Sequence, residues 1–152
     1  MSERHLLTDI RLELLHRRLR PVYRAANRDV RVPGTSERRI DLDVVAGRSN
    51  LSQAIVTRLL TPRGELAPLG HPEYGSLLHE LVGRQNTDTT RNLIKLYVLD
   101  ALRLEPRIEG GIELDVLAHP TTRSRVDITL NVRPVGATDR VTIGPFTLEL
   151  GP

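Results

Sequence analysis

The apolar pattern of the chain changes from a helical period to an extended period at one residue, Pro106. Before the proline, a helix capped by Thr87 or Asp88 is predicted from apolar residues at helical spacing, which are Ile94, Tyr97, Val98, Ala101 and Leu102. Proline lacks a backbone N–H and disfavours the α conformation at the preceding residue, so this helix is predicted to end at about Glu105. After the proline, apolar and polar residues alternate, which predicts strands with one buried face.

Three segments after Pro106 predict the strands of an antiparallel sheet. Alternation covers residues 112–116, after a bend or bulge at Gly110-Gly111, and residues 126–132. The last strand changes phase at Gly144-Pro145, where a bulge would keep its apolar residues on the core side. Those residues are Val141, Ile143, Phe146, Leu148 and Leu150. Because proline is tolerated in sheets mainly at edges and bulges, this segment is predicted to be an edge strand.

Two further helices are predicted before the helix that ends at Glu105. The first has an apolar stripe from Leu51 to Leu59 and begins at an N-cap provided by Ser49 or Asn50. The second is short and runs from Leu77 to Val82, before Gly83. The predicted fold class is therefore α+β, an antiparallel sheet covered on one face by about three helices.

The basic charge is concentrated at the N-terminal end. Residues 1–39 contain ten arginines and five acidic residues, whereas residues 40–152 contain twelve basic and fourteen acidic residues. We therefore divide the chain into a basic N-terminal arm, residues 1–38, and a domain, residues 39–152. A basic arm could meet phosphates, but arginine is favoured over lysine throughout the chain, so partner-facing or solvated charge is the preferred interpretation and no nucleic-acid partner is expected.

The arm and the residues after it contain short extended patterns. Residues 10–14 alternate as in a strand, which we prefer, although Leu6, Leu7, Ile10 and Leu14 fit a helix nearly as well. Residues 29–32 predict a second short strand, which ends at the turn pair Pro33-Gly34. Between residues 40 and 44, Ile, Leu and Val alternate with two aspartates, which predicts a half-buried strand.

Composition argues against several classes of function. Aromatic residues make up only 3% of the chain, too few for base- or sugar-stacking platforms, and there is no cysteine. The five histidines include no i, i+4 pair, so no metal site is expected, and no glycine-rich phosphate loop or other cofactor motif occurs. We also expect no signal peptide and no membrane insertion, because no stretch approaches the roughly 20 apolar residues of a membrane span.

Glycoside hydrolysis is the enzymatic alternative. It requires two carboxylates, one of them kept protonated by an apolar pocket. Glu65, Glu73 and Glu80 are the available acids, but the first two lie in predicted turns beside Arg63 and His71, which favour ionised carboxylates. We therefore expect no catalytic residue and prefer a binding module, whose open terminal strand can pair with a strand from another chain.

Two turn-rich segments and the tripeptide Glu105-Pro106-Arg107 occur in an order that resembles a known family. The first segment consists of Thr61, Pro62, Arg63, Gly64 and Glu65. The second consists of His71, Pro72, Glu73, Tyr74, Gly75 and Ser76. Together they resemble the baseplate wedge and sheath-initiator family of contractile phage tails, which has relatives in type VI secretion and in extracellular contractile injection systems. Some members of this family are labelled lysozyme-like.

The resemblance implies a structural protein of the baseplate, with a fold similar to the strand-exchange domain of contractile sheath proteins. Its edge strand, residues 141–150, would accept arm strands from sheath subunits. Glu105 and Arg107 would make charge-assisted hydrogen bonds to wedge proteins while Pro106 sets their divergence. Because such charges are expected at the surface, alanine substitution would leave the stability of the isolated domain almost unchanged.

The resemblance also implies partners and a location. The partners would be baseplate wedge proteins and the contractile sheath protein, with tube or hub proteins as further candidates, and six copies per particle. Assembly would occur in the bacterial cytoplasm. The alternative is a lysozyme-like hydrolase acting on peptidoglycan.

Overall fold

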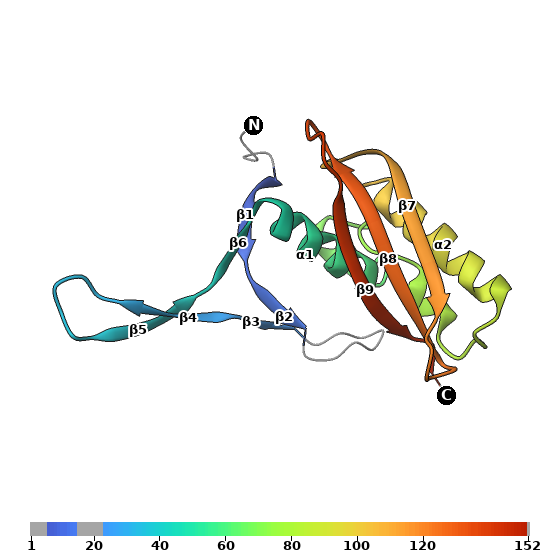
Figure 1. Cartoon of the computed structure of the whole chain (residues 1–152), viewed down its shortest axis with the longest axis horizontal. Coiled ribbons are helices and arrows are strands. Elements are labelled where there is room, and N and C mark those ends of the chain that lie inside the picture. Colours follow the sequence, from blue (N-terminus) through green and yellow to red (C-terminus); the bar gives the residue numbers. More distant parts are fainter. Residues whose placement is uncertain (1–5, 15–22, 152) are drawn as a thin grey trace.

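A three-stranded antiparallel sheet with two helices on one face forms the globular part of the computed structural model, which describes residues 6–14 and 23–151. The strands are β7 (Ile108–Ala118), β8 (Arg125–Pro134) and β9 (Val141–Glu149), in the order β7-β8-β9. The helices are α1 (Gly47–Leu60) and α2 (Asp88–Leu102), and no described helix or strand covers the other face of the sheet, which we call the open face (Figure 1). The predicted α+β class is confirmed.

Aliphatic side chains from both layers build the core. On β8, the alternating residues predicted from the sequence are fully buried, at 0% exposure for Val126, Ile128, Leu130 and Val132. Leu51, Ile55 and Leu59 of α1 and Ile94, Val98 and Leu102 of α2 pack against them. Phe146, the one phenylalanine, is only partly buried. The core therefore depends on close packing of branched aliphatic residues.

Both predicted bulges are present in the sheet. The register of β7 and β8 shifts between Glu109 and Glu113, around the glycine pair, and the register of β8 and β9 shifts at Gly144-Pro145. Gly144 has a positive φ of 102°, and a Cβ there would lie 2.6 Å from the carbonyl oxygen of Ile128, so only glycine fits. The shift keeps the apolar residues of β9 on the core side, as predicted.

The helix boundaries follow the sequence signals in part. Thr87 caps α2 as predicted, since its hydroxyl accepts a hydrogen bond from the Thr90 N–H. The cap predicted for α1 is wrong: the helix begins at Gly47, and Asn50 lies inside it and donates to the Leu6 carbonyl. The short helix predicted from Leu77 to Val82 is a 3₁₀ turn, η3 (Leu78–Leu81), and a second 3₁₀ turn, η2 (Ala67–Leu69), precedes it.

Among the described residues before α1, six short strands form three two-stranded ribbons. β1 (Thr8–Ile10) pairs with β6 (Val44–Ala46), and β2 (Leu12–Leu14) pairs with β3 (Tyr23–Ala25). β4 (Asn27–Arg31) and β5 (Arg38–Leu42) form a hairpin that projects away from the globular part (Figure 1). The segment predicted as one strand at residues 10–14 is extended but is divided at Arg11 between β1 and β2, and the strand predicted at residues 29–32 is present as β4, which ends at Arg31. Arg38, the last residue of the expected arm, is the first residue of β5, so this hairpin continues across the expected boundary.

The three ribbons meet at a cyclic set of backbone hydrogen bonds. The N–H of Arg11 donates to the Asp43 carbonyl, that of Asp43 to the Ala26 carbonyl, and that of Ala26 to the Arg11 carbonyl, at 2.9, 2.8 and 2.8 Å. Gln53 of α1 fixes the junction to the globular part, because its side-chain amide donates to the Ile10 carbonyl and accepts from the Leu12 N–H. The ribbons are therefore anchored to α1 by backbone and side-chain hydrogen bonds.

The prediction of a half-buried strand at residues 40–44 is wrong about burial. The residues are extended, but Ile40 is 79% exposed and Leu42 and Val44 are also exposed. The reason is that no second layer of the described chain covers the β4–β5 hairpin (Figure 1). Among the described residues, no helix is long and apolar enough to cross a membrane.

Candidate functional site

The tripeptide Glu105-Pro106-Arg107 lies in the turn that joins α2 to β7. Glu105 is only 4% exposed, Pro106 is exposed and Arg107 is half-buried. The Arg107 guanidinium donates to both carboxylate oxygens of Glu105, from Nε to Oε1 at 2.6 Å and from Nη2 to Oε2 at 3.2 Å. The proline that ends the helix thus places the two charged side chains in contact with each other.

A second arginine, which the sequence analysis did not identify, completes this arrangement. Arg58 of α1 is buried, and its Nη2 lies 3.3 Å from Oε2 of Glu105. Burial alone would raise the pKa of Glu105, but the hydrogen bonds and charge of Arg107, together with the charge of Arg58, hold it below its usual value. The hydrogen bond to Glu105 in turn raises the pKa of Arg107. Glu105 is therefore held as a carboxylate between two guanidinium groups.

Tyr74 adds an aromatic ring to the same place. The Arg58 guanidinium carbon lies 4.5 Å from the centroid of the Tyr74 ring, within cation–π range. Burial raises the pKa of Tyr74, so its hydroxyl stays protonated near neutral pH. We call these four residues, Arg58, Tyr74, Glu105 and Arg107, the Arg58 cluster. It joins the tripeptide to the second of the two turn-rich segments.

The two turn-rich segments are themselves bonded to each other. The Arg63 N–H donates to the Ser76 carbonyl, and the Ser76 N–H donates to the Thr61 carbonyl, both at 2.9 Å. Gly75 has a φ of 106°, and a Cβ on it would lie 2.4 Å from the Thr61 carbonyl oxygen, so the approach needs glycine. Arg63 also forms an ion pair with Asp100 of α2, at 2.7 Å. The structure therefore brings together the motif residues 61–63 and 74–76.

A cavity of about 790 Å³ lies beside these turns. Its lining residues come from β3, from the end of α1, from both turn-rich segments and from the residue after the first segment, namely Tyr23, Thr57, Leu60, Thr61, Pro62, Glu65, Leu66 and Tyr74. Tyr74 belongs both to this lining and to the Arg58 cluster, so the cluster supports one wall of the cavity. The lining combines aliphatic, aromatic and hydroxyl groups with one carboxylate, Glu65, so it suits an apolar group better than an anionic ligand.

The remaining motif residues lie at the surface. His71, Pro72 and Glu73 are exposed, as is Gly64. Glu65 and Glu80, the other two candidate acids, are also exposed. In the part of the chain that the structure describes, no group of three or more acidic or histidine side chains could hold a metal ion.

The predicted edge strand lies where the sequence placed it. β9 is at one end of the strand order and pairs with β8 only, within residues 6–14 and 23–151. Its apolar side chains Val141, Ile143 and Leu148 are buried in the core, as is Leu150 just after the strand. The apolar side chains of β9 are therefore part of the core. Its backbone forms hydrogen bonds with β8 along one side, and no described strand pairs with its other side.

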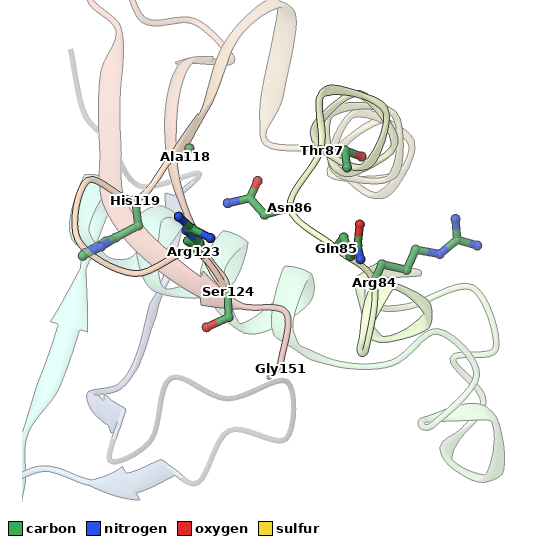
Figure 2. Close-up of a pocket in the computed structure, with 9 residues that line it drawn as sticks. All are labelled: Arg84, Gln85, Asn86, Thr87, Ala118, His119, Arg123, Ser124 and Gly151. Carbon is green, nitrogen blue, oxygen red and sulfur yellow. The ribbon is translucent and has the colours of Figure 1, made fainter.

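A second cavity, of about 560 Å³, lies between the loop before α2 and the turn that joins β7 to β8 (Figure 2). Two arginines and a histidine line it, but Arg84 points away from Arg123 and His119 (Figure 2). Asn86 is engaged by Arg125 and Arg91, so it has a structural role. None of the residues predicted for a site lines this cavity, and its cationic groups do not converge.

Comparison with known proteins identifies the class to which this α+β domain belongs. The chain matches no family model and no curated protein sequence. Among solved structures it is similar to a protein of Geobacter sulfurreducens described as a "putative tail lysozyme", with 32% sequence identity and a TM-score of 0.51. The similarity covers 66% of this chain and 89% of that protein. The chain therefore belongs to the tail-lysozyme-like family of phage tail-associated proteins.

Proposed function

We propose that this protein is a structural component of a baseplate, in a phage tail or a contractile injection particle, which binds wedge proteins and starts assembly of the contractile sheath. Membership of a tail-associated family supports the general role. The observation that carries the sheath-initiating role is the one-sided pairing of β9. Assembly in the bacterial cytoplasm, with six copies per particle, is part of this proposal.

The backbone of β9 has the geometry needed to accept a strand. The Leu150 N–H donates to the Ser124 carbonyl at 2.8 Å, so it points toward the β8 side. Because N–H directions alternate along an antiparallel strand, those of Thr147 and Glu149 point to the opposite side. On that side no strand of the described chain pairs with β9. An extended segment of a sheath subunit can therefore add to this edge.

Wedge binding is proposed for the surface formed by the 790 Å³ cavity and the exposed part of the tripeptide. Glu105 is buried, so its role is to hold Arg107 rather than to contact a partner. Arg107 uses Nε and Nη2 for Glu105, which leaves Nη1 for a carboxylate of the wedge. An apolar wedge side chain would fill the cavity beside Tyr74.

The exposure of the three candidate acids supports a non-enzymatic role. Glu65, Glu73 and Glu80 all lie at the surface, whereas the acid of a glycosidase is kept protonated by an apolar pocket. Peptidoglycan hydrolysis is retained as the second candidate because the similar protein is described as a tail lysozyme.

The test of the sheath-initiating role removes one outward N–H without removing core side chains. Thr147→Pro deletes an N–H that the β8 ladder does not use, and proline is tolerated at such edge positions. Thr147→Val is the matched control, because both substitutions lose the hydroxyl that donates to Asp127, but valine keeps the N–H. We expect particles with Thr147→Pro to carry a tube without sheath in negative-stain images, and particles with Thr147→Val to be sheathed. Normal sheath on Thr147→Pro particles would refute strand addition at this edge.

A further inference from the structure

One face of the β4–β5 hairpin carries a pattern that requires a covering surface. Asp29 lies opposite Ile40, and Arg31 lies opposite Arg38, so these four side chains share one face of the hairpin with Leu42. Ile40 is 79% exposed and Leu42 is 44% exposed. Alternation of this kind normally marks a strand with one buried face, yet nothing in the described chain covers this one.

The charges on the same face also lack a complete set of partners. Arg31 and Arg38 are directly opposite each other, and like charges in this position repel. Asp29 pairs with Arg38 at 3.0 Å, whereas Arg31 makes no ion pair with any residue that the structure describes. A partner with a carboxylate near Arg31 would relieve this repulsion. The hairpin face therefore suits an apolar surface that also bears acidic groups.

The open face of the sheet in the same chain has this chemistry. Leu117 of β7 is 65% exposed and lies opposite Asp127 of β8. Asp115, two residues before Leu117, is exposed on the same face and makes no ion pair with the described residues. Leu117 lies beside the exposed Asp115 and beside Asp127, which also accepts a hydrogen bond from Thr147. The face of Ile40 carries two arginines and one carboxylate, Asp29, which is paired with Arg38, so Arg31 and Asp115 are the complementary unpaired charges.

One chain cannot make this contact with itself. The hairpin projects to the left, away from the globular part, whereas the open sheet face is turned toward the viewer (Figure 1). We propose that the β4–β5 hairpin of one copy lies across the open sheet face of a second copy, with Ile40 against Leu117 and Arg31 facing Asp115. Because the two surfaces differ, the contact is heterologous and generates a closed ring or a chain of copies.

The test is self-association of the full-length purified protein, measured by sedimentation velocity from about 1 to 200 µM. We expect the mass to rise with concentration. Ile40→Asp, Arg31→Asp and Asp115→Arg should each weaken association by about tenfold or more. In a heterologous contact the double variant Arg31→Asp/Asp115→Arg pairs the reversed charges between copies, so it should recover association.

The controls separate this contact from other causes. Leu69→Asp removes an equally exposed apolar side chain elsewhere, and it should associate like the wild type. Thermal melts establish that each variant is folded, as expected for exposed positions. The proposal is wrong if the wild type stays monomeric throughout the range, if Ile40→Asp associates normally, or if the double variant does not recover. It is also wrong if Arg31→Asp instead abolishes steeply salt-dependent binding of duplex DNA by a monomeric protein.

Discussion

Arg58 and Glu105 form a buried ion pair, with Nη2 and Oε2 3.3 Å apart, although they are separated by 47 residues of sequence. Arg58 lies near the end of α1, and Glu105 lies just after α2, so the pair connects the two helices at one end of the fold. Arg107 donates to both oxygens of the same carboxylate, including the one that Arg58 contacts. The Glu105 carboxylate is therefore part of the protein interior, and the Arg107 side chain is half-buried against it. The expectation that both charges of the tripeptide lie at the surface is wrong.

The first prediction concerns Glu105→Ala. Removing the carboxylate leaves Arg58 buried without its partner, so unfolding should become easier by about 3–5 kcal/mol. Thermal or denaturant unfolding measures this loss. Glu109→Ala is the control, because Glu109 and Arg133 form a largely exposed pair at 3.8 Å whose loss should cost under about 1 kcal/mol. Equal melting of wild type and Glu105→Ala would contradict the role of the buried pair.

The second prediction concerns pH. The folded state holds the pKa of Glu105 below its ordinary value of 4.5, so the ionised carboxylate adds stability above that pH, and this contribution disappears as the pH falls through the folded pKa. The difference in unfolding free energy between wild type and Glu105→Gln should therefore be constant from about pH 6 to 7 and should shrink below about pH 4.5. Urea unfolding at several pH values measures it. A difference that stays constant down to about pH 3 would mean that Glu105 does not titrate as the geometry requires.

Sequence patterns predicted the sheet well because each strand carries its own signal. Val126 to Val132 alternate without error, and Gly144-Pro145 marks its bulge by a change of phase. The partner of Glu105 was missed because ion pairs between distant segments leave no local pattern. One signal was available, since Arg58 lies three residues after Ile55 on the buried stripe of α1, where an arginine needs a partner. The exposure of Ile40 was unpredictable for a different reason: alternation reports that a face is covered, but not by which molecule.

The third prediction concerns the proposed wedge surface. Leu66→Glu places a charge in the lining of the 790 Å³ cavity and should reduce co-purification with wedge proteins by about tenfold or more. Leu69→Glu makes the same change three residues later, outside the lining, and should co-purify normally. Both variants should melt like the wild type because neither residue is in the core. If both variants lose wedge binding, or if neither does, the cavity is not part of the wedge-binding surface.

The fourth prediction concerns the hydrolase alternative. The three acids are exposed, so purified protein should not clear a peptidoglycan suspension, and Glu65→Gln, Glu73→Gln and Glu80→Gln should each support normal particle assembly. Turbidity of the suspension and negative-stain images measure the two outcomes. Clearing by the wild type that is lost in Glu73→Gln would establish the enzymatic function instead.

The last prediction tests why the second turn-rich segment has a glycine at position 75. The two possible reasons are its positive φ and the close approach of the first turn. Gly70 and Gly75 both have positive φ, of 87° and 106°, so alanine is strained at either position by about 1–2 kcal/mol. A Cβ on Gly70 meets nothing within 4 Å, whereas a Cβ on Gly75 lies 2.4 Å from the Thr61 carbonyl oxygen. Gly75→Ala must therefore push apart the two turns that hold Tyr74 against Arg58, and it should lower the unfolding free energy at least about twice as much as Gly70→Ala. Co-purification with wedge proteins should fall for Gly75→Ala and stay normal for Gly70→Ala. Equal losses of stability in the two variants would mean that backbone strain alone explains the glycine and that the turns are not held in close contact.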